Sequence, residues 1–315
     1  MGEKPLTVFV TGATGVLGRP VLRRLTADGH RVKAVARSAA NDALLGELGA
    51  VPVNVDIFDR RAVEPALAGC HAVLHLATRI PQLRAMGSRD AWRENDRLRA
   101  EATQVLVDAA LAAGVSAFVY PSVCFFYPDA GDDWIEAAEP FETPDVMRST
   151  LVAEAEVARF TAAGGRGLTL RMAGFYGVDV PSTAEMLAVA RRGVSPVIGR
   201  PRAYQPLVWA DDAAAAVVAA LLEAPAGVYD VVDDEPLTRG ELVPLIAAAA
   251  GRQRLVVPPV LLARLAAGKD ATFAARSQRV SNRRLRSVTG WQPQVRDARE
   301  GWRRIAEELV PAVDA

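Results

Sequence analysis

The sequence predicts an α/β protein with a doubly wound parallel sheet and a smaller, mostly helical C-terminal lobe. Three observations predict this fold. Short β-branched runs alternate with Ala-, Leu- and Arg-rich amphipathic stretches through the first half of the chain. A glycine-rich turn separates the first apolar run from the first amphipathic stretch. After Gly177 the alternation loosens into helices and a loop rich in Gly, Pro and Arg.

The expected strands are short, continuous apolar runs, as buried parallel strands are when helices cover both faces of the sheet. In chain order we expect them at Leu6–Val10, Arg31–Ala36, Val51–Val55, Ala72–His75, Ala117–Ser122 and Leu168–Arg171, with a last strand at Val228–Val232. The helices expected between them cover Gly15–Asp28, Arg61–Leu67, Asp90–Ala113 and Asp145–Ala163. Gly29 and Gly114 are expected to end two of these helices.

The last third of the chain predicts a helical lobe. Helices are expected at Ser182–Arg192 and Asp211–Leu222, with a loop at Val194–Pro206 between them. Two or three further helices are expected, separated by Pro258-Pro259 and by Trp291-Gln292-Pro293. The sequence shows no repeat and no flexible linker, so we expect this lobe to fold onto the sheet domain.

Charge and composition exclude several classes of protein. The 315 residues carry 37 basic and 37 acidic side chains, interspersed, which is no footprint for nucleic acid or an anionic membrane. No apolar run reaches the roughly 18–20 residues that span a bilayer, and the N-terminus lacks a signal-peptide layout. Cys70 and Cys124 lie in apolar runs, and the three His show no metal spacing. We expect a cytoplasmic protein with buried free thiols, no metal and a small-molecule substrate, as a monomer or homodimer.

The glycine-rich turn Thr11-Gly12-Ala13-Thr14-Gly15-Val16-Leu17-Gly18 has the spacing of a dinucleotide-binding turn. Gly12 permits the tight turn, Gly15 lets the backbone approach a pyrophosphate, and Gly18 lets the helix pack closely on the strand. The helix N-terminus then directs free N–H groups at the phosphates. The turn predicts a Rossmann domain over residues 1–177 and 204–232, and a substrate-binding lobe over 178–203 and 233–315.

The end of the second strand predicts the cofactor. NAD sites usually place an acid there to hold the adenosine ribose, but this chain has Ala36 followed by Arg37 and Ser38. An arginine suits a 2′-phosphate through charge-assisted hydrogen bonds. We therefore expect NADP(H), bound by Arg37 and Ser38 with help from Arg19. The alternative is a solvated surface arginine.

Further short motifs follow the glycine turn in a defined order. They are Asp56-Ile57, His75-Leu76-Ala77-Thr78, Asn95, Pro121-Ser122-Val123, Arg171-Met172-Ala173-Gly174-Phe175-Tyr176-Gly177, Val208-Trp209-Ala210-Asp211-Asp212-Ala213 and Ser281-Asn282-Arg283-Arg284 with Gly290-Trp291-Gln292-Pro293. Together they resemble the extended short-chain dehydrogenase/reductases, which include sugar-nucleotide epimerases, dehydratases and ketoreductases. The resemblance covers nearly the whole chain. It implies cofactor contacts at Asp56, Ile57, Leu76, Ala77, Thr78, Pro121, Met172 and Phe175.

One departure from the family concerns its catalytic pair. The family carries YxxxK on the helix after the fifth strand, where Tyr transfers the proton and Lys lowers the pKa of Tyr and holds the nicotinamide ribose. The alignment places Val146 at the Tyr position and Thr150 at the Lys position. No shift restores the pair, because the only lysines are Lys4, Lys33 and Lys269. The chain is thus an atypical extended member without the Tyr–Lys pair.

Three residues are the expected catalytic candidates. The resemblance implies that Ser122 faces the substrate carbonyl, where it would stabilise an alkoxide; the alternative is a strand-end serine bonded to the backbone. Tyr127 and Tyr176 are candidate proton donors, although each is more often a packed aromatic. His75 is expected to be a buried core residue. A hydroxyl on the substrate is a further candidate source of the proton.

These features favour an NADPH-dependent reductase of a ketone on a small, apolar or aromatic substrate. Aromatic residues near the expected pocket support such a substrate, namely Trp92, Phe125, Phe126, Tyr127, Trp134, Phe175 and Trp209. The alternative is a catalytically inactive NADP-binding sensor or assembly protein. A nucleotide-sugar epimerase or dehydratase is a weaker alternative, because those reactions depend on the missing Tyr.

Overall fold

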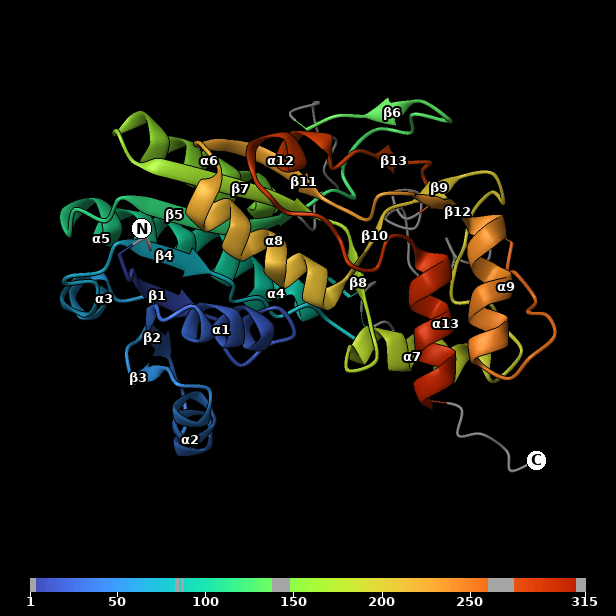
Figure 1. Cartoon of the computed structure of the whole chain (residues 1–315), viewed down its shortest axis with the longest axis horizontal. Coiled ribbons are helices and arrows are strands. Elements are labelled where there is room, and N and C mark those ends of the chain that lie inside the picture. Colours follow the sequence, from blue (N-terminus) through green and yellow to red (C-terminus); the bar gives the residue numbers. More distant parts are fainter. Residues whose placement is uncertain (1–3, 83–84, 86–87, 138–147, 260–274, 310–315) are drawn as a thin grey trace.

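The centre of the molecule is a seven-stranded sheet of parallel strands in the order β11-β7-β5-β4-β1-β2-β3 (Figure 1). The computed structural model describes residues 4–82, 85, 88–137, 148–259 and 275–309. The strands of the sheet are β1 (Thr7–Thr11), β2 (Arg31–Val35), β3 (Val51–Val53), β4 (Ala72–His75), β5 (Ala117–Val123), β7 (Arg166–Met172) and β11 (Gly227–Val231). The predicted doubly wound fold is confirmed, with its switch between β1 and β4.

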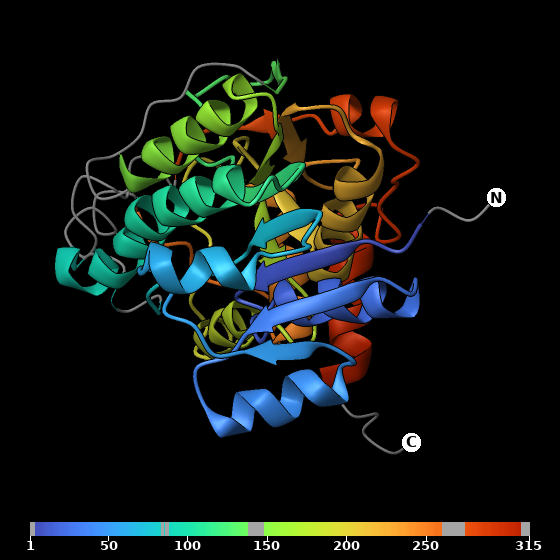
Figure 2. The same cartoon turned by 90° about the vertical axis from the view of Figure 1, so that its left-hand side faces the viewer.

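Helices cover both faces of this sheet (Figure 2). One face packs on α1 (Gly18–Ala27) and α8 (Ala210–Glu223), and the other on α3 (Arg60–Ala66), α5 (Thr103–Ala112) and α6 (Arg148–Ala162). Two apolar cores result, one on each side of the sheet. This double cover is the reason why the strands read as unbroken apolar runs.

The long helix expected at Asp90–Ala113 is interrupted. It consists of α4 (Arg89–Arg97), a π-helical turn η2 (Leu98–Ala102) and α5. A π turn holds one more residue than an α turn, so it changes which side chains face the sheet and leaves a carbonyl free for another donor. A short helix, α2 (Ala39–Glu47), follows β2 and was not predicted.

The C-terminal lobe is built on three helices that share a core, α7 (Pro181–Ala190), α9 (Arg239–Ala249) and α13 (Ala298–Leu309) (Figure 1). Short strand pairs join it to the sheet domain: β8 (Gly174–Tyr176) with β10 (Leu207–Trp209), β9 (Tyr204–Gln205) with β12 (Leu237–Thr238), and β6 (Trp134–Ile135) with β13 (Arg279–Val280), followed by α12 (Arg283–Val288). The predicted boundaries between the two lobes stay a prediction.

Candidate active site

The glycine turn between β1 and α1 has the tight geometry that its sequence predicts. Gly12 has φ +69°, and a Cβ on it would lie 2.5 Å from the backbone nitrogen of Ala77. A Cβ on Gly18 would lie 2.2 Å from the carbonyl oxygen of Gly12. A Cβ on Gly15, in contrast, would meet only that oxygen, at 3.2 Å. Packing therefore requires glycine at positions 12 and 18, whereas Gly15 is exposed and has only that oxygen close to it.

The N-terminus of α1 has no side-chain cap. Leu17 occupies the capping position without a side-chain hydrogen bond, and both Gly15 and Val16 are exposed. The first N–H groups of a helix need partners, and an anion satisfies them while meeting the positive end of the helix dipole. An uncapped helix beside an open glycine fits the pyrophosphate of a dinucleotide. The Arg19 side chain instead donates to the carbonyl of Thr14 and so holds the turn.

Two residues after β2, Arg37 and Ser38, have different roles in the structure. The Arg37 side chain is 74% exposed, and its nearest carboxylate is Glu94 at 3.9 Å. Such a loose contact leaves the guanidinium able to meet a phosphate. The Ser38 hydroxyl accepts a hydrogen bond from the backbone of Asn41 and caps α2, which is a structural task. After β3, Asp56 is exposed and accepts from the backbone of Phe58.

His75 at the end of β4 ties three elements together, as a buried residue rather than an acid. The Thr11 hydroxyl donates to Nδ1 over 2.7 Å, and Nε2 donates to the carbonyl of Leu98 over 3.0 Å. Burial lowers the pKa of His75 to about 4, so the ring is neutral near pH 7. The backbone of Ala77 donates to Thr11 in turn. The π turn is thereby fixed to the sheet beside the glycine turn.

The predicted cofactor contacts differ in accessibility. Asn95 supports them from α4, where its Oδ1 accepts from the backbone of Arg79 after β4. The exposed set is Gly15, Val16, Arg37, Ser38, Asp56 and Thr78; the half-buried set is Gly12, Thr14, Ile57, Ala77 and Phe175; and the buried set is Leu17, Gly18, Leu76, Pro121 and Met172.

Ser122 has a different partner from the one expected. Its hydroxyl donates to Oε1 of Glu154 on α6 over 2.5 Å, and Ser122 is buried. Arg171 on β7 pairs with the same carboxylate at 3.0 Å, and both side chains are almost fully buried. The geometry does not support the expected contact with a substrate carbonyl, because the hydroxyl proton is held by this carboxylate. The next residue, Val123, points to the opposite face of the strand and is half-buried.

Tyr127 lies inside the same buried network rather than in an open site. Its hydroxyl donates to both carboxylate oxygens of Asp230, at 3.0 and 3.1 Å, and accepts from Arg171 over 2.9 Å. Burial, aided by the negative charge of Asp230, raises the pKa of Tyr127 far above its usual value. This environment does not favour Tyr127 as a proton donor, and the role predicted for it stays a prediction.

Tyr176 holds the lobes together. Its hydroxyl donates to the carbonyl of Asp297, and its ring meets Trp209 edge-on at 5.4 Å and stacks on Trp302 at 6.2 Å. A Cβ on Gly301 would lie 2.3 Å from the ring, so α13 packs directly on it. Burial raises the pKa of Tyr176 well above its usual value. These contacts give Tyr176 a packing role, and the proton-donor role expected for it stays a prediction.

An arginine that sequence reasoning missed reaches the position of the absent lysine. Thr150 is buried in the first turn of α6, and Nη1 of Arg99 in the π turn donates to its hydroxyl oxygen. Val146 lies outside the described residues. Arg99 shares a helix face with Ala102 and Leu106, which are fully buried, and this spacing is the signal that would have found it.

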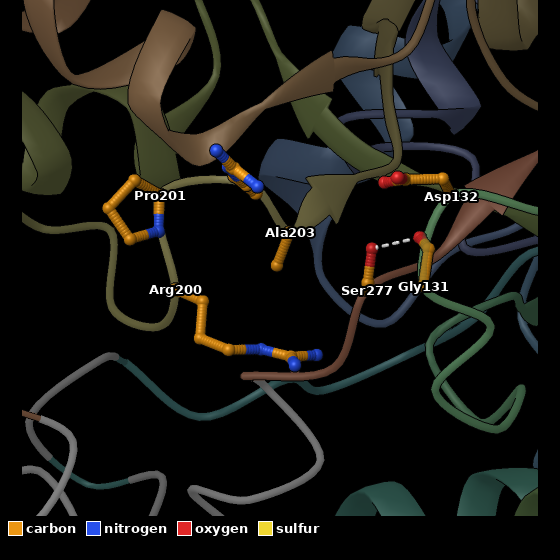
Figure 3. A pocket seen from close by; sticks show the side chains of 7 residues that line it. Gly131, Asp132, Arg200, Pro201, Ala203 and Ser277 are labelled. Atoms are coloured by element: carbon orange, nitrogen blue, oxygen red, sulfur yellow. Dashed lines mark hydrogen bonds between the residues drawn. The ribbon is translucent and has the colours of Figure 1, made fainter.

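A cavity of about 490 Å³ lies beside the loop after β5 (Figure 3). Arg200 reaches across it from the loop before β9 toward the side that carries Gly131 and Ser277 (Figure 3). The Ser277 hydroxyl donates to the carbonyl of Gly131, and Arg200 pairs with Asp129 at 2.7 Å. The lining residues are Gly131, Asp132, Arg200, Pro201, Arg202, Ala203 and Ser277.

The aromatic lining predicted for the substrate site is not found in this cavity. Trp92, Phe126 and Tyr127 are buried in the structure. Trp134 instead lines a smaller cavity of about 290 Å³, with Tyr204 beside it. Two arginines line the larger cavity, and the expectation of an apolar or aromatic substrate pocket stays a prediction.

In the part of the chain that the structure describes, no three His, Cys, Asp or Glu side chains are grouped to hold a metal ion. Cys70 and Cys124 are buried and free, as predicted. Among the described helices, none is long and apolar enough to cross a membrane.

Comparisons with known proteins identify the family. The family model described as NAD dependent epimerase/dehydratase family matches residues 8–231. A 3-diazoavenalumate denitrifying reductase of Streptomyces sp is 32% identical over 305 residues, which cover 94% of this chain and 99% of the relative. A 2-alkyl-3-oxoalkanoate reductase of Shewanella oneidensis is 27% identical over 82% of this chain and 69% of the relative.

Solved structures show the same fold. The human epimerase family protein SDR39U1, determined with NADPH, superimposes with a TM-score of 0.76 at 23% identity over 96% of this chain and 99% of that chain. MoeE5, determined with UDP-glucuronic acid and NAD, gives 0.73 at 22% identity over 94% and 96%. The chain belongs to the NAD-dependent epimerase/dehydratase family, the extended short-chain dehydrogenase/reductases. Within that family it is an oxidoreductase of the reductase type, with a nicotinamide dinucleotide as its cofactor.

Proposed function

We propose that the chain is an NADPH-dependent reductase that delivers hydride to a ketone on a small substrate without a Tyr–Lys pair. One observation carries the proposal: the uncapped end of α1 lies beside the exposed Gly15, while Val146 and Thr150 stand at the Tyr and Lys positions of the family. A chain that binds the cofactor and lacks the usual acid is suited to hydride transfer with another source of the proton.

Arg37 supports the choice of NADPH over NADH. Its guanidinium is mostly exposed beside the end of β2, and Ala36 before it is buried and carries no carboxylate. A 2′-phosphate there would form charge-assisted hydrogen bonds with Arg37 in place of its loose contact with Glu94. The free N–H groups of α1 would hold the pyrophosphate.

The chain's own residues bind and orient, whereas the bound nicotinamide supplies the hydride. Ser122, Tyr127 and Tyr176 have buried structural partners, so we do not assign the proton to them. The proton would come from water or from a hydroxyl adjacent to the reacting carbonyl on the substrate. A hydroxyl that shares its proton with the new alkoxide would remove the need for a tyrosine.

Two arginines in the cavity of about 490 Å³ support an anionic group on the substrate. Arg200 and Arg202 line it, and Arg200 shares its charge with Asp129, whereas no carboxylate lies within ion-pair distance of Arg202 among the described residues. The relatives named for 3-diazoavenalumate and for a 2-alkyl-3-oxoalkanoate act on carboxylates. We infer a keto acid whose carboxylate lies against Arg202.

The experiment is NADPH consumption with a panel of aromatic and aliphatic keto acids, each paired with its methyl ester. The proposal expects turnover of at least one keto acid, weaker turnover of its ester, and none with the Gly15→Val protein. If neither the keto acids nor their methyl esters cause NADPH consumption, ketone reduction is rejected.

A second candidate is reductive removal of nitrogen from a diazo compound. It is favoured by the named activity of the 32%-identical relative and by the absence of an available acid among the described site residues. Hydride would form a new C–H bond at the diazonium carbon as the C–N bond breaks, so that R–N₂⁺ and hydride give R–H and N₂. This reaction forms no alkoxide and therefore needs no proton donor. An arenediazonium carboxylate that yields N₂ and consumes NADPH in equal amounts, above the rate without protein, would support it.

A further inference from the structure

Arg99 is a buried cation with no anionic partner among the described residues. Only 1% of the residue is exposed. Nη1 donates to the Thr150 hydroxyl, and Nε has no partner. A buried charge ordinarily has a counter-ion, because leaving it unpaired costs several kcal/mol. The position of Arg99 therefore calls for a ligand or a function that offsets this cost.

The surrounding contacts fix Arg99 in place. The π turn is held by the hydrogen bond from His75 to the carbonyl of Leu98, one residue before Arg99. The ring of Tyr120 on β5 lies 6.0 Å from that of His75, and its hydroxyl also has no partner. Two buried polar atoms without hydrogen-bond partners, Nε of Arg99 and the Tyr120 hydroxyl, thus belong to residues that lie near His75 at the end of β4.

The Thr150 hydroxyl accepts a hydrogen bond from Arg99 and can still donate one of its own. Its oxygen accepts from the guanidinium, and its O–H has no acceptor among the described residues. A hydroxyl that accepts from a cation becomes a stronger donor, because hydrogen bonds in a chain polarise one another. Thr150 is therefore prepared to bind an oxygen that approaches the start of α6.

The topology places the second half of a dinucleotide at this point. In a doubly wound sheet the ligand lies across the carboxyl ends of the strands, on either side of the switch point. The switch here is between β1 and β4, and Arg37 after β2 marks the adenosine side. The nicotinamide half then lies over β4 and β5, where Arg99 and Thr150 meet.

We propose that Thr150 donates a hydrogen bond to the nicotinamide-side ribose of the cofactor and that Arg99 is the positioning residue that holds and polarises this hydroxyl. In the family one lysine supplies both a hydrogen-bond donor and a positive charge at this position. Here the Thr150 hydroxyl on α6 would supply the donor, and the buried Arg99 in the π turn would supply the charge. The inference rests on the proposed function, since it requires that a dinucleotide binds.

The test is the affinity of the full-length protein for NADP⁺ and for adenosine 2′,5′-bisphosphate, which lacks the second ribose. Thr150→Val removes the hydroxyl at nearly constant shape, and Thr150→Ser retains it. We expect Thr150→Val to weaken NADP⁺ binding roughly tenfold and to leave bisphosphate binding unchanged, with Thr150→Ser close to wild type. Ser149→Ala, whose hydroxyl bonds Asp96 in the next position of α6, is the matched control and should bind both ligands normally.

Arg99→Met separates this role from a structural one. Replacing an unpaired buried cation with an apolar side chain of similar length should leave the Tm of the ligand-free protein unchanged or raise it. NADP⁺ binding should nevertheless weaken roughly tenfold or more, and Arg99→Lys should recover part of the loss. Thr150→Val added to Arg99→Met should cost little more, because the two residues act as one unit.

Three outcomes would overturn the inference. One is normal NADP⁺ affinity in both Thr150→Val and Arg99→Met. Another is an equal loss of affinity for adenosine 2′,5′-bisphosphate in these variants, which would show that Arg99 and Thr150 do not act at the nicotinamide-side ribose. The third is a fall in Tm for Arg99→Met that accounts for the loss of binding. If the wild-type protein binds neither NADP⁺ nor NAD⁺, the proposed function fails and the inference with it.

Discussion

Ser122 on β5 and Glu154 on α6 are joined by a hydrogen bond of 2.5 Å. Glu154 also pairs with Arg171, and Arg171 continues the network to Tyr127 and Asp230. These five side chains come from β5, α6, β7, β11 and the loop after β5, and they lie at the carboxyl ends of the strands. We expect this network to support the candidate site structurally rather than to take part in its chemistry.

Ser122→Ala is therefore expected to lower stability and to leave turnover near the wild-type level. Loss of a hydrogen bond to a charged partner costs about 1.5–3 kcal/mol, whereas Glu154→Ala removes the carboxylate that pairs with the buried Arg171 and should cost about 3–5 kcal/mol. Urea unfolding measures both. Ser116→Ala, whose exposed hydroxyl bonds the His71 carbonyl, is the control and should change stability by less than about 0.5 kcal/mol. A Ser122→Ala protein with normal stability and a large loss of kcat would show instead that Ser122 contacts the substrate.

Asp230 should make the protein less stable as pH rises. Burial raises its pKa to about 8, whereas an unfolded Asp titrates near about 4. Between these values the folded state holds a proton that the unfolded state has lost, so the free energy of unfolding falls with increasing pH. Asp230→Asn keeps an acceptor for Tyr127 and cannot titrate. Urea unfolding at pH 5 and pH 8 should show a smaller decline for this variant, and equal declines would contradict the assignment.

Arg37 is expected to set the preference between the two nicotinamide cofactors. Arg37→Ala should weaken NADPH binding roughly tenfold or more and leave NADH binding unchanged, because only NADPH carries the 2′-phosphate. Isothermal titration with both cofactors measures this. Arg93→Ala, an exposed arginine paired with Asp90 on α4, serves as the control. Equal affinity of the wild-type protein for the two cofactors would show that Arg37 is a solvated surface residue.

Gly15 and Gly18 should respond differently to the same added methyl group. Gly18→Ala drives a Cβ into the Gly12 carbonyl and should destabilise the fold, with a lower Tm. Gly15→Ala meets only an oxygen at 3.2 Å and should fold normally, while Gly15→Val should abolish cofactor binding. Circular dichroism and NADPH titration of the three variants test the difference. Normal NADPH affinity in folded Gly15→Val would show that the turn does not hold the cofactor.

The sheet and most of its helices could be predicted because their signals are local. The apolar runs and the glycine turn each depend on a few neighbouring residues, and their strands appear within two residues of the predicted positions. The π turn at Leu98–Ala102 could not be predicted in this way. It depends on a hydrogen bond from His75, which is 23 residues away in the sequence.

The candidate site was predicted less well, for the same reason. The position of Ser122 at the end of β5 was correct, but its partner Glu154 lies 32 residues further along the chain. Tyr127 likewise finds Asp230 at a separation of 103 residues. Sequence motifs locate such residues on the fold, but burial and long-range partners decide their roles. Arg99 and Thr150 are 51 residues apart, and only the folded chain brings them together.

The central claim is that the protein transfers hydride from NADPH to its substrate. NADPH that carries deuterium on one face of the nicotinamide C4, used with an accepted keto acid, tests it most directly by mass spectrometry of the product. The account predicts one deuterium at the former carbonyl carbon from one face of the nicotinamide only, and none from the other face. Product without deuterium from either labelled NADPH, or the same labelling in the absence of protein, would contradict it.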